Sequence, residues 1–365
     1  MAENLKMKST EEYLNEINAK GLADMLWDLV KVPSPTGQER KAVLKYAELL
    51  KNVGAEVELD EFFPESPAVI GRLKGNRAGK CIQLAGHIDN INKSHQEPKR
   101  ENDIISGRGS ADMKNGLSGI LEVVRVLSKN GCDFPGEVLI TVFGQHETPV
   151  GNQKPLMRML EHGIKGDAAI VAESFSESTI VVAKGQAIWN IQLRREGRVC
   201  HELSRSPEMD NLLKSVVKVI EFIQKKNYKL WARPHEYNKL GAETLFIGQV
   251  HYGDFYNRVP TECKLQGTYR WHPNNSFEQV QKDMVKNLNK LHLPGNISFD
   301  ISWILSGESY EVDSDEPVIQ ALRNSCEAVT GRKWHFGGTS VVTDACRISR
   351  TGNIPVGVLG FGSET

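Results

Sequence analysis

The sequence predicts an α/β protein in which helices flank a mostly parallel sheet, with an α+β domain inserted into it. The chain has 365 residues, more than the roughly 250 to 300 at which single hydrophobic cores stop growing, so about two domains are expected. In the first half, apolar strands alternate with helices, which is typical of a parallel sheet covered on both faces. Near residue 186 the strands become alternating in character, and near residue 296 the first pattern returns. We therefore expect a main domain in two parts, residues 1–185 and 294–365, around an inserted domain of residues 186–293.

The N-terminal part is expected to begin with two helices. Residues 9–32 carry apolar side chains at helical spacing behind a Ser-Thr-Glu-Glu cap, and the stretch PSPTGQE ends this helix. A second helix, residues 39–54, closes at a glycine. Three strands are then expected, at residues 56–61, 68–75 and 80–89.

The alternation continues on both sides of the inserted domain. Before it, helices are expected at residues 115–131 and 152–163, and strands at residues 136–145 and 167–174. The inserted domain should form an antiparallel sheet with one helix, from residues 183–197, 211–226, 243–253 and 262–271. Three segments then return to the first pattern, at residues 316–331, 340–352 and 354–362.

The composition disfavours several classes of partner. Lys and Arg total 45 against 46 for Asp and Glu, so the chain has no basic field to attract nucleic acid. No apolar run approaches the ~20 residues needed to span a bilayer, and the polar N-terminus lacks the pattern of a secretory signal. The six cysteines stand singly, which favours reduced thiols over a zinc or redox motif. We expect a cytoplasmic protein that binds a small molecule or another protein, not nucleic acid or a membrane.

Potential metal ligands follow three of the predicted strands, and one more acid lies in a glycine-rich loop before a helix. Imidazole nitrogen with carboxylate oxygen suits zinc or its first-row neighbours, and several carboxylates suit a site for two ions. Because the carboxyl ends of parallel strands meet at the edge where α/β proteins bind ligands, we expect these groups to converge. The candidates are His87 and Asp89 in LAGHIDN, Asp112 in SGRGSADMKNG, His146 and Glu147 in FGQHETPVG, and Glu173 in IVAESFSES.

Each of these motifs alone is also typical of something simpler. A lone His-x-Asp is more often a surface pair than a ligand pair, and Glu173 could cap the turn after its strand. The loop SGRGSAD could be a plain glycine turn; a phosphate-binding loop is disfavoured there because no Gly-Lys-Ser/Thr follows. Only the joint pattern favours a metal site.

A series of motifs occurs in a familiar order and spacing: VKVPSPTGQE, GHID, SGRGSADMKNG, IVAES, AKGQA, GRVCHELSRSP, YNRVP and GGTSVVTDA. Through them the chain resembles the dinuclear zinc amidohydrolases that include acetylornithine deacetylase, succinyl-diaminopimelate desuccinylase, aminoacylase and related peptidases. The resemblance runs from about Leu22 to the last residue. It implies a metal-dependent hydrolase of the amide bond of N-acyl amino acids or small peptides, whose inserted domain is a lid that forms a homodimer.

The resemblance also implies roles at the metal site. His87 matches a ligand of the first ion, with Asp89 orienting its imidazole. Asp112 matches the carboxylate that bridges the two ions, Glu173 a second carboxylate on the first ion, and Glu147 a ligand of the second. Two zinc ions are implied, with cobalt or manganese as alternatives, and they would acidify a water that attacks an amide carbonyl.

Three residues of the lid are implied to serve the site as well. His201 in CHELSRSP matches a histidine that reaches into the partner subunit's site and stabilises the oxyanion. Asn257 and Arg258 in YNRVP match substrate contacts, and the arginine suits a substrate carboxylate. An ordinary polar lid surface would also account for all three.

The chain departs from the family's pattern in two places. Where the family has two adjacent acids, a general base and then a ligand, this chain has His146 and Glu147. We align His146 with the base because its distance from Asp112 is the usual one; its neutral imidazole could accept a proton or bind an ion instead. The family also continues past the stretch IPVGVLGFGSET into a further ligand histidine and a closing helix, so the second ion position is expected to be incomplete within these residues.

Three functional hypotheses follow. The first is a dimeric zinc-type deacylase or peptidase acting on N-acyl amino acids or small peptides. The second is a catalytically weakened relative that binds such molecules without cleaving them. The third is a hydrolase of another small amide or carbamoyl compound that lacks an α-carboxylate, for which Arg258 would not be needed.

Overall fold

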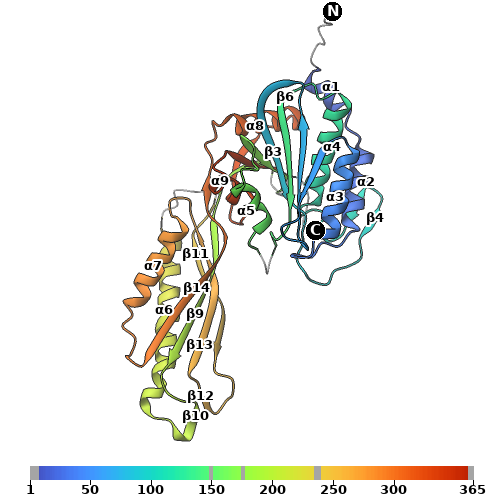
Figure 1. Cartoon of the computed structure of the whole chain (residues 1–365). Coiled ribbons are helices and arrows are strands. Elements are labelled where there is room, and N and C mark those ends of the chain that lie inside the picture. The colour runs from blue at the N-terminus through green and yellow to red at the C-terminus, as the bar shows by residue number, and fades with distance from the viewer. Residues whose placement is uncertain (1–7, 148–150, 174–176, 234–239, 361–365) are drawn as a thin grey trace, which may run out of the picture. The chain divides into compact units, whose positions relative to one another are not determined.

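The computed structural model describes residues 8–147, 151–173, 177–233 and 240–360, and it divides into two compact units (Figure 1). The first unit comprises Met1–Val181, Val312–Gly337 and Thr343–Thr365. The second comprises Val182–Glu311 and Gly338–Val342. The α/β fold with an inserted second unit is the class that the sequence predicts.

The sheet of the first unit has parallel strands at its centre and antiparallel strands toward its edges. Four neighbouring strands are parallel, in the order β6 (Pro135–Phe143), β3 (Arg77–His87), β7 (Ala168–Val171) and β17 (Val356–Val358). Antiparallel strands continue the sheet beyond β6 and beyond β17: β2 (Ala68–Lys74) with β1 (Glu56–Asp60), and β8 (Ser178–Ala183). The last six residues of β6 are all buried, because helices cover both faces of these central strands.

Helices lie on both sides of this sheet (Figure 1). On one side are α2 (Ala19–Val30), α3 (Arg40–Asn52) and α4 (Lys114–Lys129); on the other are α5 (Lys154–Glu161), α8 (Pro317–Thr330) and α9 (Ala345–Arg350). The helix expected over residues 9–32 is two helices, α1 (Thr10–Leu14) and α2. The break occurs because the Asn18 side chain accepts a hydrogen bond from the Gly21 N–H at 3.0 Å and so caps a new helix.

The second unit is a four-stranded antiparallel sheet with two helices. The strand order is β11 (Thr244–Tyr252), β13 (Glu262–Trp271), β9 (Gly185–Arg195) and β14 (Ile297–Gly307). Alternate residues of β9 are buried, and they form a core with α6 (Asn211–Trp231) and α7 (Phe277–Asn289). Because β14 pairs with β9, this unit extends to Glu311, past the boundary at residue 293 that the sequence suggests.

Short elements complete the described chain. The strands β4 (Lys99–Glu101) and β5 (Ile104–Ser106) form a hairpin, β10 (Cys200–His201) pairs with β12 (Arg258–Val259), and both β15 (Tyr310–Glu311) and β16 (His335–Thr339) pair with β8. Two 3₁₀ turns, Glu202–Ser204 and Pro207–Asp210, precede α6. Within the described residues, no helix combines the length and the apolar character needed to cross a membrane.

Candidate metal centre

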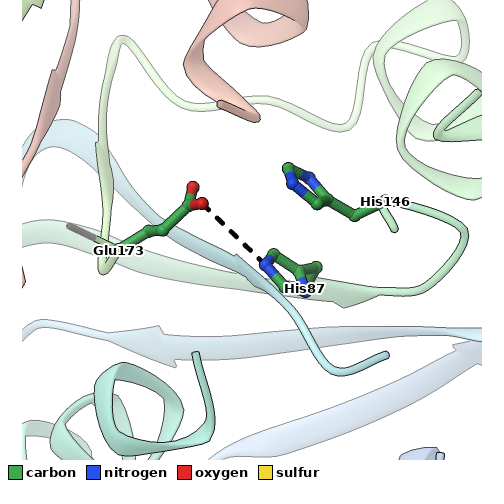
Figure 2. Close-up of side chains that lie close together, drawn as sticks. All are labelled: His87, His146 and Glu173. Carbon is green, nitrogen blue, oxygen red and sulfur yellow. Dashed lines mark ion pairs between the residues drawn. The ribbon is translucent and has the colours of Figure 1, made fainter. Parts of the chain in front are cut away.

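The first unit brings two histidines and a carboxylate together where its parallel strands end. His87 is the last residue of β3, His146 follows β6, and Glu173 follows β7. Each offers one ligand atom, and these atoms all lie within 4.8 Å of one another. Figure 2 shows the three side chains directed toward a common space. The rigid strands fix the backbone while the loops expose the polar groups, so this edge of the sheet is suited to binding a ligand.

His87 is fully buried and faces oxygen atoms at both ring nitrogens. Its Nδ1 lies 3.2 Å from the carbonyl oxygen of Asp89, and its Nε2 lies 3.1 Å from Asp112 Oδ1 and 4.0 Å from Glu173 Oε1. Burial alone would lower the pKa of His87, but hydrogen bonds to the two aspartates raise it well above its ordinary value. The nitrogen Nε2 of His87 and the carboxylates of Asp112 and Glu173 therefore face the same space. A cation could bind there in place of the proton on Nε2.

The carboxylate of Asp89 links Thr36 to the loop that carries His146 and Glu147. Its Oδ2 accepts hydrogen bonds from the Thr36 hydroxyl at 3.0 Å and the Glu147 N–H at 2.9 Å, and its Oδ1 accepts one from the His146 N–H at 3.2 Å. Burial would raise the pKa of Asp89, but the hydrogen bond with His87 and the nearby histidine charges hold it at about 2. As an ionised acceptor, Asp89 lies 3.5 Å from His87 Nδ1 and binds two backbone N–H groups of the loop that follows β6.

His146 is held from its other side by Asp344, a fully buried acid just before α9. The His146 Nδ1 lies 2.7 Å from Asp344 Oδ1, and its ring stacks on that of His87 with centroids 4.0 Å apart and an angle of 7° between the planes. Gln153 Nε2 also donates to Asp344 Oδ1, at 3.0 Å, and Arg347 Nε donates to Gln153 Oε1 at 3.1 Å. Burial and the His87 charge lower the pKa of His146, but Asp344 raises it to about 9.

The remaining carboxylates leave negative charge and a free acceptor in the site. Burial raises the pKa of Glu173 to about 7, and its Oε2 has no hydrogen-bond partner among the described residues. Burial also raises the pKa of Glu147. At Asp112, burial is outweighed by the hydrogen bond with His87, which lowers the pKa of the acid. A divalent cation would neutralise these acids and satisfy the orphan oxygen, so the residues present fit an ion such as zinc.

The strand-end residues singled out from the sequence thus lie in one neighbourhood, although their separate roles stay predictions. Asp112 contacts His87 directly, whereas Glu147 is tied to Asp89 through its backbone. For His146 the sequence leaves two roles open, proton acceptor or ligand, and its ligand atom lies in the group of three possible ligands.

The three lid residues also lie together, within the second unit. His201 pairs with Arg258 in the β10–β12 ladder, and Asn257 Nδ2 lies 3.1 Å from His201 Nε2. The Arg258 guanidinium is already engaged, because its Nε donates to Asp254 Oδ1 at 2.9 Å. A substrate carboxylate would have to compete with that aspartate.

The sequence did not single out Asp344, Gln153 or Glu39. Asp344 stood in the motif GGTSVVTDA, where an acid directly before a helix was a usable signal. Gln153 carried no such signal. Glu39 is fully buried, and its Oε1 accepts the backbone N–H groups of Gly37 at 2.6 Å and Gln145 at 3.0 Å. Through its hydrogen bond with Gln145, Glu39 fixes the start of the loop after β6.

Comparisons with known proteins agree with this fold. Residues 83–365 match the family model described as peptidase family M20/M25/M40. An N-formyl-4-amino-5-aminomethyl-2-methylpyrimidine deformylase from Halalkalibacterium halodurans is 23% identical, with 98% of this chain and 91% of the relative covered. A succinyl-diaminopimelate desuccinylase from Marinobacter nauticus is 24% identical, with 76% and 74% covered. The crystal structure of aminopeptidase PepT from Bacillus cereus has the same fold, with a TM-score of 0.75, 19% identity, and 95% of this chain and 91% of that chain covered.

Proposed function

The chain belongs to peptidase family M20/M25/M40 and is a metal-dependent amidohydrolase, and we propose that it cleaves N-acyl amino acids or small peptides with zinc as its metal. The observation that carries this proposal is the convergence of His87, His146 and Glu173, whose ligand atoms lie within 4.8 Å of one another at the carboxyl edge of the sheet. Two histidines with a carboxylate are a donor set that suits zinc.

The metal residues are proposed in the roles that the resemblance to the family implies. His87, Asp112 and Glu173 would hold a first ion, Glu147 would serve a second beyond Asp112, and Asp89 would orient His87. When bound, zinc would polarise the substrate carbonyl and acidify the attacking water. Cobalt and manganese accept the same donors and are the alternatives.

The lid is proposed to complete the site. His201 would stabilise the negative charge that develops on the carbonyl oxygen, and Asn257, 3.1 Å from its Nε2, would bind substrate beside it. We also propose a homodimer formed through the lid, because β11 is an edge strand whose side chains Phe246 and Val250 are exposed. All six cysteines are unpaired, which supports a reducing, cytoplasmic location.

A second candidate function is hydrolysis of a small amide without an α-carboxylate, such as an N-formyl amine. The observation that favours it is the hydrogen bond from Arg258 to Asp254. Arg258, the residue expected to bind a substrate carboxylate, is already paired with that aspartate. The deformylase relative, covered over 91% of its length, acts on a formyl aminopyrimidine by its name and supports the same candidate.

One substrate panel tests both candidates and the non-cleaving alternative. The purified protein would be assayed with zinc against N-acetyl and N-succinyl amino acids, dipeptides and tripeptides, and an N-formyl aminomethylpyrimidine. Turnover that a chelator abolishes and zinc restores supports the hydrolase, whereas substrate binding without any turnover supports the weakened relative.

Arg258→Ala then separates the two substrate classes. If Arg258 binds a substrate carboxylate, this change raises KM for the acyl amino acids, whereas turnover of a formyl amine stays as it was. Arg198→Ala is the matched control, since Arg198 is an exposed arginine of the same unit. Equal effects of the two changes would remove Arg258 from the substrate site.

A further inference from the structure

His146 directs its Nδ1 toward Asp344, and its Nε2 has no hydrogen-bond partner among the residues that the structure describes. Its Nδ1 lies 2.7 Å from Asp344 Oδ1, and the Gln153 amide is oriented by Arg347 so that it also donates to that oxygen. Asp344 Oδ1 is therefore an acceptor. Gln153 Nε2 also lies near His146 Nδ1, but farther away, at 3.2 Å, so in neutral His146 the proton belongs on Nδ1, toward Asp344. The lone pair of Nε2 then remains available to a ligand.

We propose that His146 is a metal ligand through Nε2, on the ion that His87 and Glu173 hold, and that Asp344 is the positioning residue that fixes its ring. This inference rests on the proposed metal-dependent function. It gives His146 a role different from the proton-accepting one that alignment with the family's first acid predicts. It also explains the contact between Asp344 and His146, which would orient the His146 ring toward the ion.

Three features favour a ligand over a proton acceptor. The ligand atoms of His146, His87 and Glu173 lie within 4.8 Å of one another, and a zinc ion with bonds of about 2.0–2.2 Å would draw them only slightly closer. Two histidines and a glutamate form a ligand set found at catalytic zinc, and the fourth position would fall to Asp112, which lies 3.1 Å from His87 Nε2. A carboxylate behind a histidine, as Asp344 is here, is the usual support of a ligating imidazole.

The stacked rings add a further argument. The ring centroids of His87 and His146 lie 4.0 Å apart with an angle of 7° between the planes, so one ion beside Glu173 could be reached by both imidazoles.

The direct test counts imidazoles around the bound metal. Protein loaded with one equivalent of zinc would be measured by X-ray absorption at the zinc edge, and two imidazoles per ion are expected in the wild type. His146→Ala should retain one. His162→Ala is the matched control and should keep two, because His162 is exposed and its Nδ1 contacts the Arg158 carbonyl oxygen, outside the site.

The positioning role of Asp344 is tested by zinc affinity. Asp344→Asn should weaken zinc binding by about 10–100-fold, the loss typical when the partner of a ligating histidine is changed. Asp315→Asn, at an exposed acid of the same unit, should leave the affinity unchanged. Circular dichroism of the metal-free variants would establish that both fold.

The outcomes separate this inference from the proposed function. One imidazole per zinc in the wild type, with zinc affinity unchanged in His146→Ala, overturns the ligand role and returns His146 to the position of a base. A wild type that binds no zinc overturns both the ligand role and the metal-dependent function. Should His146→Ala fail to fold, the wild-type absorption spectrum still decides, because it needs no variant.

Discussion

At residue 144 the chain passes so close to Glu39 that a side chain has no room. A Cβ added to Gly144 would lie 2.4 Å from Glu39 Cδ and 2.6 Å from its Oε1. That same Oε1 accepts the backbone N–H of Gln145 at 3.0 Å. The glycine and the buried glutamate together set where the loop leaves β6, and hence where His146 and Glu147 lie.

We predict that Gly144→Ala disturbs the metal site more than its small size suggests. The new methyl group should push the Glu39 carboxylate from its place, which would lower the free energy of unfolding by about 1–3 kcal/mol. Zinc affinity and turnover should fall with it, since the loop carries His146. Isothermal titration with zinc and urea unfolding of the metal-free protein would measure the two effects.

Gly119→Ala is the control for this prediction. Gly119 lies within α4, and a Cβ there would meet nothing within 4 Å. The change should therefore stabilise the protein by about 0.5–1 kcal/mol, as alanine does in helices, and leave zinc binding alone. If Gly144→Ala and Gly119→Ala change stability and zinc affinity alike, the contact with Glu39 is not the cause of the effect at Gly144.

Single residues were predictable where the signal was local. A histidine or acid directly after an apolar strand stands out in the sequence, which is why His87, His146 and Glu173 could be chosen. The partner of His146 could not, because Asp344 lies 198 positions further along the chain and only the folded sheet brings them together. Whether His146 binds a proton or an ion depends on that distant partner.

At the scale of elements, a buried lysine joins α4 to α2. Lys114 donates from Nζ to the carbonyl oxygens of Leu29 at 3.0 Å and Val32 at 2.9 Å, at the C-terminal end of α2. A cation there gives the Val32 carbonyl a donor, adds a second donor to the Leu29 carbonyl, which also accepts the Val32 N–H, and interacts favourably with the helix dipole. Burial lowers the pKa of Lys114 to about 8.

Lys114→Met should therefore destabilise the first unit. The methionine keeps much of the packing volume but removes the Nζ donor from the carbonyl oxygens of Leu29 and Val32, which should lower the free energy of unfolding by about 1–3 kcal/mol. Lys41→Met, at an exposed position of α3, should change it by less than about 0.5 kcal/mol. Urea unfolding of both variants would check this, and a neutral Lys114→Met would show that the lysine is replaceable.

The elements themselves were largely predictable, because hydrophobic periodicity is a local property. The strands β3 and β6 and the helices α3 and α4 lie where the periodicity places them. Two features depended on more than periodicity. The first helix breaks because of one capping asparagine, Asn18. Residues 297–307 alternate like a strand, but the choice of β9 as the partner of β14 is made by long-range packing.

At the scale of the whole molecule, the proposed metal residues all belong to the first unit, while the second has its own core. We predict that calorimetry resolves two unfolding transitions and that zinc raises only one of them. A ligand at 100 times its Kd stabilises the state that binds it by about 2.7 kcal/mol. A chelator should reverse the shift, and movement of both transitions by equal amounts would mean that the units unfold together.

The last prediction concerns the lid and the proposed dimer. His201 belongs to the second unit and Asp112 to the first, so the two residues can be inactivated independently. If each subunit lends His201 to its partner's site, a heterodimer of His201→Ala and Asp112→Ala subunits contains one complete site, because the Asp112→Ala subunit still supplies its histidine. Either variant alone should be nearly inactive. After random exchange about half of the dimers are mixed, so the mixture should recover about a quarter of wild-type turnover.

A mixture of Asp112→Ala and Glu173→Ala is the matched control. Both changes lie in the first unit, so every site in every dimer lacks one metal residue and no turnover should return. Light scattering would verify that the proteins are dimers and that subunits exchange. If exchange occurs and the first mixture stays inactive, His201 serves its own subunit or none, and the lid acts without sharing residues across the interface.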